Sequence, residues 1–338
     1  MHHRLPDRVY ASEARRRHLD AARDSRKRIV RGMMGRTTLY QRVFSFFRRV
    51  RAPLRATRAF HFFGSRALRL RLTDLCLYYP DLPAAFDGYC ILHLTDLHLD
   101  HIDDTDLAIV DIAADVPADL CVITGDFRDS LNAPMAPMLA SVEAIIAAVG
   151  ASDGAVGVLG NHDSVAMVEP LESLGITMLV NESLTLERAG EVIHLTGLDD
   201  VHKFRSEAAE AALHATPDGF SIALVHSPEI VESAARRHDL YLTGHTHGGQ
   251  ICLPGGRPIL TSLKPPYRTL ARGLWAHDDM VGYTSCGLGA AGLPLRMNCP
   301  GELVRVTLRC GARKSMIDGR TVAPEEHWRI PPGQHRRD

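Results

Sequence analysis

The sequence predicts an α/β protein, and two observations lead to that prediction. Short apolar runs alternate with stretches of helical periodicity from residue 90 to residue 250. The chain has 338 residues, 45% of them hydrophobic, so it can bury a sizeable core as one large domain or two small ones. Strands and helices that alternate in this way indicate a buried sheet covered by helices.

The elements follow from the apolar pattern taken in chain order. Strands are predicted at 90–95, 120–124, 155–159, 176–179, 193–196, 221–225, 240–243, 281–285 and 303–308. Helices are predicted at 105–114, 137–149, 165–174, 206–215 and 229–237. Residues 73–89 predict a lead-in strand and a turn. The polar, proline-containing end of the chain predicts a tail that frays.

Charge divides the chain into a basic arm and an acidic body. Residues 1–72 hold 20 Lys and Arg against 4 Asp and Glu, whereas the remainder holds 19 against 36. Residues 1–37 are rich in Arg and lack sustained periodicity, which is typical of a solvated or disordered arm. We therefore expect an arm at 1–72, a globular domain at 73–310 and a polar tail at 311–338.

The segment 39–70 interleaves Phe, Leu and Val with Arg. Such a basic amphipathic segment is typical of a peptide that lies on an anionic membrane surface, with Phe in the acyl boundary and Arg on the head groups. The same pattern fits a helix packed on the acidic body, or an arm that binds nucleic acid. The membrane surface is the partner we expect first, and nucleic acid is the less favoured one.

Cysteine usage and hydropathy indicate the compartment. The seven cysteines are scattered and form no CxxC motif, so neither a zinc ribbon nor a disulfide framework is expected. Buried free thiols suit a reducing compartment. The sequence contains no run of 18 apolar residues and no signal-peptide core at its start. We expect a cytosolic protein without a membrane span.

The stretch GHTHGGQ, residues 244–250, is the first sign of a metal site. His245 and His247 directly follow a predicted strand, and side chains at i and i+2 leave an extended chain on the same side. An isolated His-x-His is also common in surface turns. The decision therefore depends on whether other ligand-type residues occur in the same context.

Five predicted strands run directly into residues that commonly ligate metals. These residues are, in chain order, Asp96 and His98, Asp126, Asn161 with His162 and Asp163, His226, and His245 with His247. Functional sites of α/β sheets form where the carboxyl ends of strands meet loops, so all five ends are expected to surround one cleft.

The residue types indicate the chemistry. Asp, Asn and His suit Mn²⁺, Fe or Zn²⁺, and the absence of cysteine speaks against a structural thiolate zinc site. The set holds more ligands than one tetrahedral ion needs, which favours two divalent ions with a bridging group. Metal pairs of this kind clamp the attacking and leaving oxygens of a displacement at phosphorus. The sequence therefore predicts hydrolysis of a phosphate ester or anhydride.

The motifs DLH, GD, GNHD, VH and GHTH, in this order, resemble those of the calcineurin-like metallophosphoesterase superfamily over residues 90–250. The resemblance implies a four-layer α-β-β-α sandwich of two mixed sheets. It also implies that Asp96, His98 and His247 hold one ion, that Asn161, His226 and His245 hold the other, and that Asp126 bridges them.

Two further residues of the GNHD motif receive catalytic roles from the same resemblance. His162 matches the position that contacts the scissile phosphate and helps to protonate the leaving oxygen, and Asp163 would orient such groups. The sequence differs in GDFRDS, where Arg128 precedes Asp129. Arg128 is expected to be a solvated loop residue, with contact to substrate phosphate as the alternative.

Beyond residue 250, GGQICLP, YTSCGLG and the run at 293–308 resemble a bacterial branch of membrane-associated phosphodiesterases. One group in that branch cleaves the pyrophosphate of UDP-2,3-diacylglucosamine in lipid A synthesis. This substrate would agree with the segment 39–70, and the resemblance implies a cytoplasmic protein that is peripheral on the inner face of a bacterial plasma membrane. Two alternatives stay open: a nuclease or phosphodiesterase acting on nucleic acid or soluble nucleotides, and a non-catalytic, metal-stabilised membrane-binding module.

Overall fold

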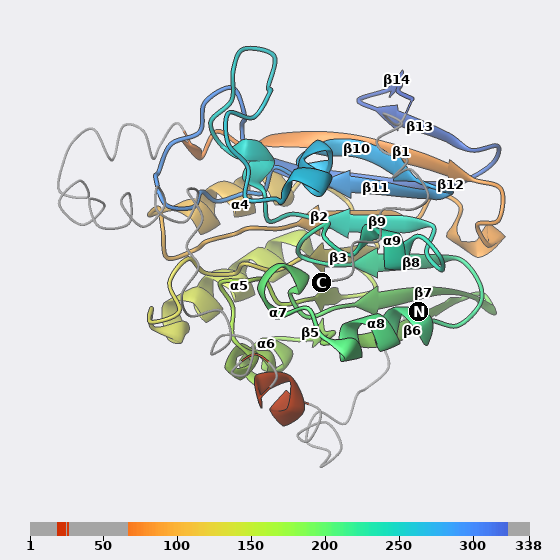
Figure 1. Ribbon diagram of the computed structural model, residues 1–338, viewed down its shortest axis with the longest axis horizontal. Helices are drawn as coiled ribbons and strands as arrows, with labels where there is room; N and C mark the ends of the chain where they lie inside the picture. The colour runs from red at the N-terminus through yellow and green to blue at the C-terminus, as the bar shows by residue number, and fades with distance from the viewer. Residues whose placement is uncertain (1–18, 25, 27–66, 324–338) are drawn as a thin grey trace.

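The computed structural model describes residues 19–24, 26 and 67–323. Two mixed β-sheets lie face to face at its centre (Figure 1). In spatial order the larger sheet contains β14 (Arg320–Thr321), β13 (Lys314–Ile317), β1 (Arg71–Tyr79), β12 (Glu302–Cys310), β2 (Cys90–Leu94), β3 (Leu120–Ile123), β4 (Ala155–Gly157) and β5 (Ile176–Met178). The smaller sheet contains β10 (Gly273–His277), β11 (Met280–Thr284), β9 (Leu240–Thr243), β8 (Ser221–Leu224), β7 (Glu191–Gly197) and β6 (Glu182–Arg188).

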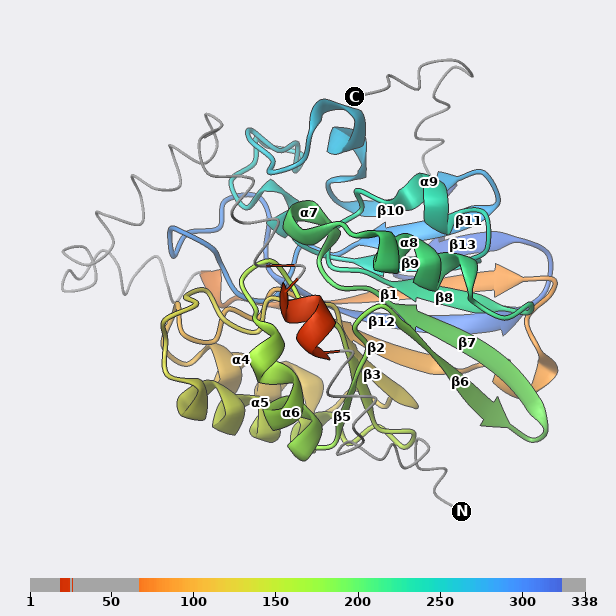
Figure 2. The same cartoon turned by 60° about the horizontal axis from the view of Figure 1, so that its bottom comes forward.

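Helices cover the outer face of each sheet (Figure 2). On the larger sheet these are α4 (Thr105–Ala113), α5 (Met135–Val149) and α6 (Val168–Ser173), and on the smaller sheet α7 (Val201–Phe204), α8 (Glu207–His214) and α9 (Val231–Ala234). One apolar core fills the space between the sheets, and a separate core lies under each helix layer. The predicted α/β class and its four-layer sandwich of two mixed sheets are confirmed.

The strands that run toward the predicted ligands lie side by side in parallel. β2, β3, β4 and β5 pair in parallel in the larger sheet, and β7, β8 and β9 pair in parallel in the smaller one. These strands are buried along their whole length apart from their first residues, which explains why they are continuous apolar runs in the sequence. Their carboxyl ends therefore meet on one side of the sandwich.

Four strands in the described residues were not predicted, and all lie toward sheet edges. β6 carries charged residues, and β10, β13 and β14 contain at most two buried residues each, so none of the four is a continuous apolar run. β13 pairs with β1, with Leu75 opposite Ile317. The larger sheet thus continues beyond residue 310, into the segment for which the sequence predicts a fraying tail.

The arm contains one described helix, formed by residues 19–24 and 26. Leu19 and Ala22 are buried in the same core as α5 and α6, and the helix lies beside α6 in both views (Figures 1 and 2). The expectation of a solvated arm is therefore wrong for this stretch, because two apolar residues one turn apart give the helix a face that packs. The predicted membrane segment lies outside the described residues, except for 67–70.

Candidate metal centre

The predicted ligands come from the ends of adjacent parallel strands. Asp96 and His98 follow β2, Asp126 follows β3 and Asn161 follows β4, all in the larger sheet. His226 follows β8, and His245 and His247 follow β9, in the smaller sheet. Both sheets thus deliver side chains to the same edge of the sandwich, where these residues are buried. The site arises because parallel strands expose their carboxyl ends together.

Five of the predicted ligands adopt a left-handed backbone conformation. They are Asp96 (φ 53°), His98 (φ 43°), Asp126 (φ 55°), His245 (φ 71°) and His247 (φ 51°). This region is unfavourable for residues with a side chain, and such conformations cluster at functional sites where surrounding structure enforces them. The strained residues therefore lie in the turns that directly follow β2, β3 and β9.

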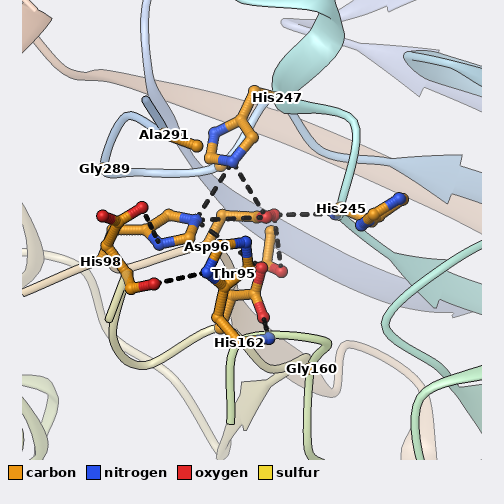
Figure 3. Close-up of polar contacts among 12 residues, drawn as sticks. Thr95, Asp96, His98, Gly160, His162, His245, His247, Gly289 and Ala291 are labelled. Carbon is orange, nitrogen blue, oxygen red and sulfur yellow. Dashed lines mark hydrogen bonds and ion pairs between the residues drawn. The ribbon is translucent and has the colours of Figure 1, made fainter. Parts of the chain in front are cut away.

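The first group of ligand atoms joins Asp96, His98 and His247. Their nearest donor atoms all lie within 4.8 Å of one another. Nε2 of His247 is 3.4 Å from Oδ1 of Asp96 and 3.1 Å from Nε2 of His98 (Figure 3). Asp96 is held by its other oxygen, which accepts from the backbone N–H of His245 at 2.9 Å and from Thr95 Oγ1 at 3.0 Å. The free oxygen therefore points at the two imidazoles.

The second group joins Asp126, His226 and His245, again within 4.8 Å. Nε2 of His226 is 3.2 Å from Oδ2 of Asp126, and its Nδ1 donates to the backbone oxygen of Thr124 at 2.7 Å, which aims Nε2 into the site. Asn161 precedes His162, whose backbone N–H donates to Oδ1 of Asp126 at 2.8 Å.

Asp126 lies between the two groups. Its Oδ2 is 3.6 Å from Nε2 of His98 in the first group and 3.2 Å from Nε2 of His226 in the second. The structure thus brings six of the seven predicted ligands together, with the predicted bridging carboxylate in the middle. Asn161, the seventh, is adjacent in the chain to His162, whose backbone N–H bonds Asp126.

Three of the four histidines predicted as ligands are neutral in this centre. Burial lowers the pKa of His98 to about 4 and those of His245 and His247 well below their ordinary value, so these imidazoles are neutral and keep a lone pair at pH 7. Burial alone would lower the pKa of His226, but the Asp126 carboxylate outweighs it and raises that pKa to about 10. A cation that binds Nε2 of His226 would therefore take the place of the proton beside Asp126.

The donor set fits divalent cations. Oδ1 of Asp96, Oδ1 of Asn161, Nε2 of His226 and both ring nitrogens of His245 are buried without a hydrogen-bond partner among the described residues. Leaving buried polar groups unpaired costs free energy, and several such atoms facing one space are typical of ligands that a metal satisfies. Carboxylate, amide and imidazole donors suit Mn²⁺, Fe and Zn²⁺.

His162 and Asp163 occupy different positions. The ring of His162 packs edge-on against His98 with centroids 5.1 Å apart, and its Nδ1 donates to the backbone oxygen of Asp129 at 2.5 Å, which leaves Nε2 to exchange a proton. Asp163 lies behind the site, where its carboxylate accepts backbone N–H groups of Gly160, Asp126 and Phe127 at 2.8 to 3.1 Å. Asp163 therefore orients the loops and does not itself face the ligand space.

The environment of Arg128 differs from the solvated one that the sequence predicts. The residue is buried, with 4% of its surface exposed, and its Nη2 donates to Ser164 Oγ at 3.2 Å. It is therefore not a solvated loop residue, because its loop folds back onto the turn that begins α6. The neighbouring Asp129 carboxylate lies 3.4 Å from Nδ1 of His101 and 3.9 Å from Nδ1 of His98, which is the ring nitrogen of His98 opposite the one that faces His247.

Sequence reasoning missed a second pair beside the site. His202, in α7, lies against His245 with ring centroids 4.3 Å apart, and Glu229 holds its Nδ1. Ser227 Oγ donates to the same Glu229 oxygen at 3.2 Å. His202 sits on no predicted element and follows no strand directly, so no pattern in the sequence distinguishes it from the other histidines.

The fold and the site define a metal-dependent hydrolase of phosphoric esters, and comparisons with known proteins agree. Residues 90–249 match the family model described as calcineurin-like phosphoesterase. The uncharacterized metallophosphoesterase YkoQ of Bacillus subtilis is 32% identical over 221 residues, covering 63% of this chain and 81% of that protein. Phosphodiesterase YaeI of Escherichia coli is 31% identical over 229 residues, covering 64% and 81%.

The chain therefore belongs to the calcineurin-like metallophosphoesterase family, as the sequence motifs predict. YkuE of Bacillus subtilis, another uncharacterized metallophosphoesterase, is 32% identical over 239 residues, covering 68% of this chain and 82% of that protein.

Metal addition is expected to stabilise the protein. A cation present at a hundredfold excess over its Kd contributes about 2.7 kcal/mol to folding, which raises Tm by roughly 5 °C in a chain of this size. Scanning calorimetry of metal-free protein with and without Mn²⁺ measures the shift. Ca²⁺ is the control, because it prefers oxygen ligands and this site is rich in imidazole. An equal shift with Ca²⁺ would contradict a dedicated transition-metal centre.

Proposed function

We propose that this protein uses two divalent ions, Mn²⁺ first among them, to hydrolyse a phosphodiester or pyrophosphate bond in a membrane-associated substrate such as UDP-2,3-diacylglucosamine. The observation that supports a membrane-associated substrate is an exposed apolar surface beside the loop that follows His247. The name phosphodiesterase carried by a relative of 31% identity supports a diester-type substrate.

The residues of the centre would have two roles, metal binding and proton transfer. Bound divalent ions would supply a water of lowered pKa and positive charge for the phosphate oxygens. One ion would be held by Asp96, His98 and His247. The other would be held by Asn161, His226 and His245, and Asp126 would be a ligand of both.

His162 would serve proton transfer in this scheme. Nδ1 of His162 is committed to the backbone oxygen of Asp129, so its Nε2 would carry the proton that the leaving oxygen needs. Asp163 would keep the turn that carries Asn161 and His162 in register with Asp126, through the backbone N–H groups it accepts.

An apolar rim borders the loop that follows His247. It consists of Leu253, Ile259, Leu260 and Met297, each 45 to 50% exposed. These four are among the seven large apolar side chains that are exposed in the described part of the chain. Large exposed apolar patches mark interaction sites.

Backbone hydrogen bonds fix the apolar rim to the metal centre. Cys252 N donates to Met297 O at 2.9 Å, and Met297 N donates to Gln250 O at 3.0 Å. The Gln250 side chain in turn bonds the backbone of Ala291 and Leu293. The rim is thus held a few residues from His247, where an acyl chain of a lipid substrate could rest while its phosphate reaches the ions.

The charge around the apolar rim suits an anionic surface. Residues 251–277 contain Arg257, Lys264, Arg268 and Arg272 and no Asp or Glu, although the body as a whole is acidic. Arg257, Lys264 and Arg268 are exposed. Apolar side chains flanked by basic ones are typical of surfaces that contact anionic head groups. In this proposal the segment 39–70 adds a second contact on the inner face of the plasma membrane.

The experiment compares one lipid and one soluble substrate. With Mn²⁺, the protein is expected to release UMP from UDP-2,3-diacylglucosamine in mixed micelles and to hydrolyse bis(p-nitrophenyl) phosphate. Leu260→Asp should lower kcat/KM for the lipid about tenfold, since burying a leucine contributes roughly 1.5–3 kcal/mol, and leave the soluble diester unchanged.

Leu107→Asp is the matched control, because Leu107 is 61% exposed on α4. Equal loss in both variants, or no UMP release, would contradict the lipid substrate. Nuclease activity that falls steeply with salt would point to nucleic acid instead.

The structure describes no helix long and apolar enough to cross a membrane within residues 19–24, 26 and 67–323.

A further inference from the structure

The N-terminal helix, residues 19–24 and 26, carries a guanidinium into the interior beside the metal centre. Arg26 is 7% exposed, and its Nε lies 3.0 Å from both carboxylate oxygens of Asp199. The guanidinium carbon of Arg26 lies over the ring of Phe204, 4.3 Å from the centroid. A buried arginine that pairs with a buried carboxylate occupies one fixed geometry.

The same guanidinium holds the turn that carries Asn161 and His162. Nη1 of Arg26 donates to the backbone oxygen of Asp163 at 2.6 Å, and Nη2 reaches the backbone oxygen of Gly160 at 3.5 Å. These carbonyls stand immediately before Asn161 and immediately after His162. The Asp163 carboxylate accepts N–H groups of the same turn and of the Asp126 loop. Arg26 therefore holds the turn through its backbone carbonyl oxygens, and Asp163 holds it through its backbone N–H groups.

Through Asp199 the guanidinium also reaches the other half of the centre. Asp199 Oδ1 accepts the N–H of Asp200 at 2.9 Å. Asp200 caps α7 by accepting the N–H groups of His202 and Lys203 at 3.1 and 2.9 Å. His202 then packs on the ring of His245. Arg26 thus contacts the turn that carries Asn161. Through Asp199 it also reaches the loop of α7, whose His202 packs on His245.

We propose that Arg26 is a positioning residue for hydrolysis, and that the N-terminal helix is part of the catalytic unit. Arg26 fixes the backbone around Asn161 and His162, and its pairing with Asp199 couples that turn to the α7 loop. Without Arg26 the Asp199 carboxylate would be buried without its cation, so helix docking and assembly of the site depend on each other. The proposal rests on the family's metal-dependent hydrolysis and not on the substrate.

The test uses the full chain with Arg26→Ala and Arg26→Lys. Lysine keeps a cation for Asp199 but has no planar fork to reach two carbonyls as well. The matched control is Arg23→Ala, because Arg23 belongs to the same helix but is half-exposed and pairs with Asp20 at 3.0 Å. Three quantities are measured: Tm, kcat and KM with bis(p-nitrophenyl) phosphate, and Mn²⁺ affinity by isothermal titration calorimetry.

Both Arg26 variants are expected to lower kcat about tenfold or more with KM changed less than threefold, and to weaken Mn²⁺ binding about 10- to 100-fold, as removal of groups behind metal ligands does. Arg26→Lys should keep most of the wild-type Tm, and Arg23→Ala should match the wild type in all three. If the kcat and Mn²⁺ affinity of Arg26→Lys or of Arg26→Ala equal those of the wild type, the positioning role is wrong and Arg26 only stabilises the fold.

The metal titration keeps this test separate from the proposed substrate. If the wild-type protein fails to cleave UDP-2,3-diacylglucosamine, the lipid proposal falls while the Mn²⁺ titration still decides the role of Arg26. If Arg26→Ala fails to fold, Arg26→Lys still decides the outcome, since its Mn²⁺ affinity either falls with kcat or stays at the wild-type value.

Discussion

Asp126→Asn is expected to lower kcat for a phosphodiester by at least about 10³-fold, because metal ions supply several kcal/mol of stabilisation to charge on phosphate oxygens and each 1.4 kcal/mol is tenfold. Asp126 is the carboxylate that touches both ligand groups, with Oδ2 3.6 Å from Nε2 of His98 and 3.2 Å from Nε2 of His226. Asparagine keeps the volume and removes the charge. Turnover of bis(p-nitrophenyl) phosphate and metal content of the purified variant measure the effect.

The control for this substitution is Asp218→Asn. The Asp218 side chain is 99% exposed and pairs with Arg237 at the surface, so its loss should leave turnover and metal content at wild-type values. Retention of two equivalents of metal and a tenth or more of wild-type turnover in Asp126→Asn would contradict a bridging role for this carboxylate.

Gly244→Ala is expected to remove the first ion and to destabilise the protein by about 1–3 kcal/mol, the usual cost of overpacking. A Cβ on Gly244 would lie 2.3 Å from Oδ2 of Asp96 and 2.2 Å from Oγ1 of Thr95. Oδ2 is the oxygen by which His245 N and Thr95 hold Asp96 in place. The methyl group therefore displaces a metal ligand, and Tm together with Mn²⁺ stoichiometry records both losses.

Gly190→Ala is the matched control for a glycine substitution. Gly190 has φ 82°, and a Cβ there would meet nothing within 4 Å. Alanine at this turn should cost roughly 1–2 kcal/mol through its left-handed backbone and leave metal binding unchanged. If Gly244→Ala binds the full complement of metal with only a comparable loss of stability, the close approach to Asp96 does not govern the site.

The ligand strands were the most predictable part of the fold. β2, β3, β4, β8 and β9 are buried nearly throughout, so each is a short apolar run bounded by polar ligand residues. The family follows from the motifs that those strands carry, and the match over residues 90–249 confirms it. Edge strands such as β6 and β10 do not follow from the apolar pattern. Each contains both buried and more exposed residues, so its sequence shows no continuous apolar run.

Second-layer residues were the least predictable part of the site. Arg26 lies 173 residues from Asp199 and in an Arg-rich stretch, so nothing local distinguishes it from Arg23, which stays at the surface. The sequence predicts a solvated Arg128 because arginines in loops are usually solvated, but in the structure its guanidinium donates to Ser164. Burial of a charged residue depends on which partner the fold places beside it.

By itself the sequence determined the α/β class, the family and the set of ligand-type residues, since these depend on local apolar periodicity and on short motifs. Tertiary structure decided how the ligands divide between the ends of two sheets, that His202 packs beside His245, and that a helix of the arm packs beside the centre. Those features depend on contacts between residues far apart in the chain. Such contacts leave no periodic signal in the sequence, because a buried ion pair needs only one residue at each end.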